Sequence, residues 1–66
     1  MKVEEAIRYF ERELEKIEEA EAIEASAAEP DEDLLHAWSY EREVTNMALE
    51  ALRVILARLV FLGIDG

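Results

Sequence analysis

The sequence contains no cysteine, and it has only one histidine, one proline and two glycines in 66 residues. Without cysteine, neither a disulfide nor a thiolate metal site can form. A single histidine, His36, excludes the usual multi-histidine zinc site within one chain. A chain this short forms one small domain that needs a disulfide, a metal or association to be more than marginally stable. By elimination, we expect it to associate.

Long apolar runs are also missing. The longest, Val54 to Leu62, is interrupted by Arg58 and falls well short of the roughly 18 apolar residues that a membrane span requires. The opening residues, Met1 to Glu5, lack the basic-then-apolar layout of a signal peptide. We therefore expect a cytoplasmic protein that has no membrane partner and requires no cofactor.

Basic residues are scarce, with 7 Lys and Arg against 17 Asp and Glu and a net charge of −10. Residues 1–33 carry 13 acids and 4 bases, a net −9, whereas residues 34–66 carry 4 acids and 3 bases, a net −1. This acidity argues against nucleic acid as a partner, because nucleic acid rewards clustered Lys and Arg. The acidic coat is typical of a solubilising surface. An alternative is an acidic inhibitor that imitates DNA phosphates and docks on a host nucleic-acid-binding protein.

The first half of the chain predicts one helix over residues 3–27, because it is built almost wholly from helix-forming residues. Its apolar residues recur at alternating steps of four and three, which is typical of a helix that packs along one seam. These residues are Val3, Ile7, Phe10, Leu14 and Ile17.

A turn is predicted over residues 28–31, because Pro30 disfavours helical geometry at the residue before it. Asp31 and the acids that follow suit the start of a second helix over residues 32–62, where they can cap free amides. Gly63 is a plausible stop for that helix. The whole chain, 1–66, is thus predicted to be a single all-α antiparallel hairpin.

We expect one broad face of the second helix to pack against the first, with Arg42, Asn46, Glu50 and Arg53 on the opposite side. Beyond Arg53 the helix is apolar nearly all round, which is typical of a helix buried on every side. The predicted inward face consists of Leu34, Ala37, Val44, Ala48, Leu52, Ile55, Leu59 and Leu62.

The second helix is longer than the first, so the stretch from Leu59 to Ile64 should project beyond its neighbour. Leaving these side chains in water would forgo roughly 1.5–3 kcal/mol each. We therefore predict that hairpins associate as dimers or tetramers, forming a four-helix or larger bundle. The alternative is a heterologous protein that receives this end in a groove. The predicted interface consists of Val54, Ile55, Leu56, Leu59, Val60, Phe61 and Leu62.

Catalytic signatures are absent from the sequence. It has no Ser-His-acid grouping, no glycine-rich phosphate loop and no cysteine nucleophile, so we do not expect an enzyme. The alternative chemistry is a carboxylate-rich metal-binding bundle, because di-iron bundles combine inward glutamates with a Glu-x-x-His motif. The nearest match here is Asp33-Leu34-Leu35-His36. The candidate ligands are Glu21, Glu24, Asp33, His36 and Glu41.

Two short stretches resemble small acidic helical proteins of bacteriophages and prophages. These are Val3-Glu4-Glu5-Ala6-Ile7 and Asn46-Met47-Ala48-Leu49-Glu50-Ala51-Leu52. The resemblance implies a phage origin but no defined activity. The apolar ending, Arg53 to Ile64, departs from that group, whose members usually turn polar there. A designed assembly is the alternative origin, although Ser39, Thr45 and Asn46 are irregular for one.

Overall fold

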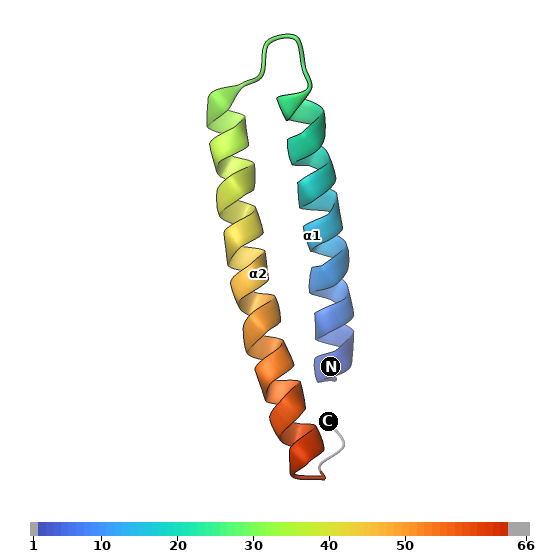
Figure 1. Cartoon of the computed structure of the whole chain (residues 1–66). Helices are drawn as coiled ribbons and strands as arrows, with labels where there is room; N and C mark the ends of the chain where they lie inside the picture. The colour runs from blue at the N-terminus through green and yellow to red at the C-terminus, as the bar shows by residue number, and fades with distance from the viewer. Residues whose placement is uncertain (1, 64–66) are drawn as a thin grey trace.

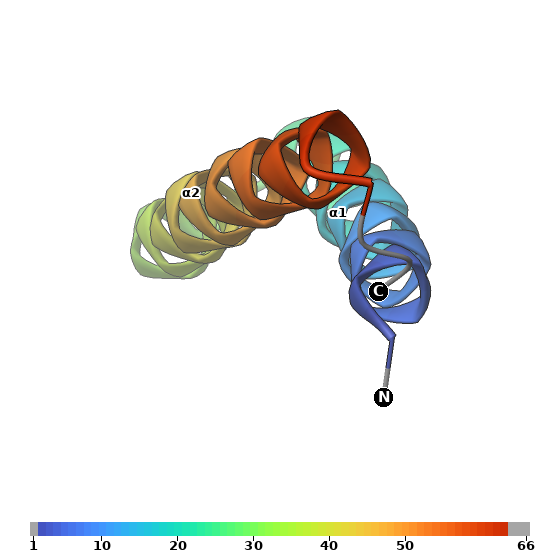
Figure 2. The same ribbon diagram turned by 90° about the horizontal axis from the view of Figure 1, so that it is seen from below.

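The computed structural model describes residues 2–63, which form two α-helices, α1 (Val3–Ala25) and α2 (Glu32–Phe61). The helices run antiparallel and side by side, so the predicted all-α hairpin is confirmed (Figure 1). The molecule is a rod with extents of 52 × 15 × 14 Å. The C-terminal end of α2 continues past the first residues of α1 (Figure 1). Seen from the end opposite the turn, the two helix axes are inclined to each other (Figure 2).

The turn between the helices is held by two carboxylates. Asp31 is the N-cap of α2, and its Oδ1 accepts hydrogen bonds from the amides of Asp33 and Leu34 at 3.0 and 3.2 Å. Glu24, near the end of α1, accepts a hydrogen bond from the Asp31 amide at 2.8 Å. The cap predicted at Asp31 is therefore confirmed, and Glu24 ties the two helix ends together.

The C-terminal end of α2 has the predicted glycine stop. Gly63 has φ of 72°, a conformation that favours glycine, and its amide donates to the Val60 carbonyl at 3.1 Å.

The two helices meet along an inner seam. On each helix, successive residues of this seam are alternately three and four positions apart. Every side chain in this seam is buried or half-buried, and Leu49, at 1% exposure, is the most deeply buried. The α1 stripe predicted from the sequence is confirmed, and Glu21 and Glu24 continue it. The seam consists of Val3, Ile7, Phe10, Leu14, Ile17, Glu21 and Glu24 of α1, with Leu35, Trp38, Arg42, Thr45, Leu49, Leu52, Leu56 and Leu59 of α2.

The predicted inward face of α2 is largely wrong. Of its members, Ala48, Leu52 and Leu59 are half-buried, whereas the other five are exposed, namely Leu34, Ala37, Val44, Ile55 and Leu62. Arg42, which was expected on the outside, lies half-buried in the inner seam.

The physical reason is that α2 is apolar over more than half of its circumference, so two apolar stripes compete for α1. The stripe that packs against α1 buries larger side chains, among them Trp38, Leu49 and Leu56, whereas the stripe that α1 leaves uncovered has alanine at several positions. Arg42 is accommodated because Glu21 of α1 pairs with it.

Candidate interaction surface

The side of α2 that faces away from α1 exposes large apolar side chains at intervals along the helix, with His36, Glu43 and Glu50 exposed between them. Its central column recurs every seven residues and is highly exposed: Tyr40 at 67%, Met47 at 70% and Phe61 at 89%. A contiguous exposed apolar surface on a small chain marks a site of interaction. We call this surface the outer face of α2. It consists of Leu34, Tyr40, Val44, Met47, Val54, Ile55, Phe61 and Leu62, all exposed.

The residues predicted as an oligomer interface divide into two groups. Five of them are exposed, namely Val54, Ile55, Val60, Phe61 and Leu62. The other two, Leu56 and Leu59, are half-buried in the inner seam. Leu56, although not among the residues predicted to face α1, therefore does face it. Ile64, the last residue of the predicted projection, lies outside the described residues.

The predicted interface lies only at the end of α2, but the outer face begins at Leu34, about one helical turn after the Asp31 cap. The signal that would have located it is the seven-residue repeat of Tyr40, Met47, Val54 and Phe61. That repeat was missed because Arg42, Thr45 and Asn46 lie among its first members and make the region look polar.

The outer face is hollowed near its C-terminal end. A groove of about 430 Å³ is lined by Val54, Ala57, Arg58, Phe61 and Leu62. The Arg58 side chain is the one charged group in this lining, and the rest is hydrocarbon. Such a groove suits an apolar side chain from another protein surface.

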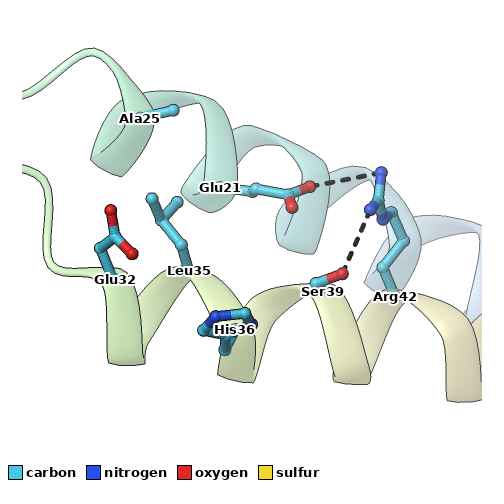
Figure 3. A pocket seen from close by; sticks show the side chains of 7 residues that line it. All are labelled: Glu21, Ala25, Glu32, Leu35, His36, Ser39 and Arg42. Carbon is cyan, nitrogen blue, oxygen red and sulfur yellow. Dashed lines mark hydrogen bonds and ion pairs between the residues drawn. The ribbon is translucent and has the colours of Figure 1, made fainter.

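A second groove of about 540 Å³ lies near the turn and is polar in character (Figure 3). The Arg42 guanidinium occupies one end of it, 3.5 Å from the Glu21 carboxylate across the seam and 3.4 Å from the Ser39 hydroxyl (Figure 3). Arg42 thereby interacts with groups of both helices, whereas Glu32, which also lines the groove, forms no ion pair within residues 2–63. Its lining is Glu21, Ala25, Glu32, Leu35, His36, Ser39 and Arg42.

The five candidate metal ligands do not converge. Glu21 pairs with Arg42, and Glu24 accepts the Asp31 amide. Asp33, His36 and Glu41 are exposed at separate positions along α2. Within residues 2–63, no three acidic or histidine side chains lie close enough together to hold a metal ion. The structure thus gives no support to the metal-binding alternative.

Neither α1 nor α2 combines the length and hydropathy of a transmembrane helix over the part of the chain that the structure describes. No protein-family model, characterised protein or solved structure matches this chain. Function must therefore be argued from the hairpin itself, which is a small helical scaffold with many exposed apolar side chains.

Proposed function

We propose that this protein is a non-catalytic assembly protein that acts by associating with copies of itself through the outer face of α2. The product is a four-helix or larger bundle in which α2 is internal and the acidic α1 faces water. A phage origin, as the sequence resemblance implies, is part of this proposal.

The observation that carries the proposal is the repeated exposure of large apolar side chains along α2, from Leu34 to Leu62. Burying a large apolar side chain contributes roughly 1.5–3 kcal/mol. Because these side chains are already partly covered, the outer face contributes on the order of 10 kcal/mol for each copy. Association itself costs about 4–15 kcal/mol. Two such faces are therefore sufficient to hold two copies together.

The fold also supports this role because the hairpin alone has almost no core. Among the described residues, the buried apolar side chains are Ile7, Ile17 and Leu49, and of these Leu49 alone is fully buried. A domain with so small a core depends on further burial for stability. Association through α2 supplies that burial while leaving the charged surface of α1 in water.

Light scattering coupled to size-exclusion chromatography tests the proposal. The wild-type chain should have the mass of two or more copies. Val54→Gln with Phe61→Gln should shift the chain toward one copy, because burying a polar amide without a partner costs free energy. The two substitutions leave the net charge unchanged. The matched control is Ile23→Gln, since Ile23 is an exposed apolar residue on α1 outside the outer face. A wild-type chain that remains single at all concentrations would contradict self-association.

A further inference from the structure

A row of α2 residues beside the inner seam forms a second seam that α1 leaves uncovered. It follows the same alternating steps of three and four residues that bring two helices together along their length. All but one of its members are exposed, and Ala48 is half-buried. The row starts at Leu34, passes Glu41, Val44, Ile55 and Arg58, and ends at Leu62.

The second seam carries two charges of opposite sign, Glu41 near its start and Arg58 near its end. Both side chains are exposed. Among residues 2–63, the ion pairs are formed by Lys16, Arg42 and Arg53, so neither seam charge is paired with another residue of that range. Burying an unpaired charge is costly. Whatever covers this seam must therefore present a base to Glu41 and an acid to Arg58.

A second copy of the chain meets this requirement in one orientation. We propose that α2 packs antiparallel against α2 of a second copy, with Glu41 facing Arg58 of the second copy and Arg58 facing its Glu41. Two-fold symmetry then produces this ion pair twice. A parallel pairing would place Glu41 beside Glu41 and Arg58 beside Arg58, and like charges in contact are strongly unfavourable.

The register that these charges define fits the remaining residues of the seam. It places Ile55 against Val44 of the second copy and Leu62 against Ala37, so large side chains meet smaller ones. Ala48 and Ala51 meet at the two-fold axis, where small side chains allow the helix backbones to approach closely. Sliding the register by one heptad so that Glu41 faces Ala51 would place both charges against apolar residues, because Arg58 would then face Leu34. Sliding it by one heptad the other way would place Arg58 against Ala48 and carry Glu41 past the end of the partner helix.

The exposed column beside the seam is covered by the same pairing. Antiparallel helices bring equivalent flanking columns together, which places Phe61 alongside Tyr40 of the second copy and Met47 alongside Val54. Phe61, at 89% exposure the most exposed large apolar residue described, thereby gains an aromatic neighbour. The contact extends over most of α2, about 40 Å at 1.5 Å per residue.

This inference rests on the proposed function and specifies its geometry. The test uses two charge-reversed chains, Glu41→Arg and Arg58→Glu, with sedimentation equilibrium as the measurement. Each reversal alone creates two like-charge contacts in the dimer and should raise its dissociation constant about tenfold or more. Glu43→Arg is the matched control for the first reversal, because Glu43 is an exposed acid on α2 outside both seams.

Mixing the two reversed chains provides the decisive readout. In a heterodimer both contacts again join a base to an acid, one with the original polarity and one with the polarity reversed, so the equimolar mixture should associate within about threefold of wild type. This readout remains valid if either chain is unfolded alone, because the mixture then regains helicity.

The outcomes separate the inference from the proposed function. A wild-type chain that associates, together with a mixture that forms no heterodimer, overturns the antiparallel pairing and leaves self-association intact. A wild-type chain that stays single at every concentration overturns both.

Discussion

At the scale of single residues, the start of α2 depends on one side chain. Asp31 accepts hydrogen bonds from two amides of the first turn, which would otherwise have no partner. Asp31→Ala should lower the free energy of unfolding by about 1 kcal/mol. Urea denaturation followed by circular dichroism measures this change. Asp33→Ala removes the same charge from the same turn without removing the cap. It should lower the free energy of unfolding by clearly less than Asp31→Ala does.

Leu49 is the residue on which the inner seam depends most, because it is 1% exposed while nearly all its seam neighbours are half-buried. Leu49→Ala should destabilise the hairpin by about 2–5 kcal/mol, which approaches the entire stability of a small domain. Ile23→Ala removes a branched side chain that is 67% exposed and should change stability by no more than about 0.5 kcal/mol. Equal losses in the two variants, measured by urea denaturation, would mean that the seam is packed differently.

At the scale of the elements, the two helices differ in how well their sequences define them. The stripe of α1 from Val3 to Ile17 is the one apolar row on a strongly charged helix, so the sequence is sufficient to predict its inward side. The turn and the start of α2 follow equally directly from Pro30 and Asp31, because these residues restrict the backbone or cap it locally. The end of α1 does not, since α1 ends at Ala25, two residues before its predicted end and outside the reach of Pro30.

The inward side of α2 could not be predicted from its own sequence, because two rows on it satisfy the same spacing. Six of the eight residues predicted to face α1, among them Leu34, Val44 and Ile55, lie on the second seam, and the other two, Leu52 and Leu59, lie in the inner seam. The row that faces α1 includes Arg42 and Thr45, and polar residues at such positions are normally assigned to water. The larger side chains of that row, together with Glu21 of α1, which gives Arg42 a partner inside the seam, explain why it faces α1.

That ion pair suggests a role in fixing the alignment of the two helices. Glu21→Leu with Arg42→Leu would make the seam apolar at this layer and should raise the unfolding free energy by about 1 kcal/mol, because apolar replacement of a partly buried pair is often stabilising. The seam would also lose the ion pair that favours this alignment of the two helices. We expect a higher melting temperature together with a second set of backbone amide resonances.

The single substitution Arg42→Leu provides the control for this prediction. Arg42→Leu alone leaves Glu21, which is 23% exposed, without its partner and should be less stable than the double variant. If the double variant is less stable than both the wild type and Arg42→Leu, the ion pair contributes to stability rather than to alignment.

At the scale of the whole molecule, charge and apolar surface are divided between the helices. Residues 1–33 carry a net charge of −9 and residues 34–66 carry −1, while the large exposed apolar side chains lie mostly on α2. This division suits a molecule that is one half of a larger bundle, with α2 inside and α1 outside. It also means that association brings two chains of net charge −10 together.

The salt dependence of association follows from that charge. Each pair of chains must overcome mutual repulsion that acts over about 10 Å at 0.1 M salt and is screened as salt rises. The Arg58 and Glu41 contacts are weakened by the same screening, but they are few beside the repulsion between the acidic α1 surfaces. Self-association should therefore tighten by about tenfold between roughly 0.02 M and 0.5 M sodium chloride.

A heterologous complex would show the opposite trend. If the acidic surface instead docks on a basic nucleic-acid-binding protein, salt weakens the complex, because the attraction between opposite charges is screened. Sedimentation equilibrium of the purified chain at several salt concentrations measures the salt dependence of self-association directly.

Substituting α1 acids with glutamine, as in Glu5→Gln with Glu19→Gln, should reduce this salt dependence, since both carboxylates are exposed on the surface of α1. Association that weakens as salt rises would mean that the seam charges, and not the apolar outer face, hold the copies together.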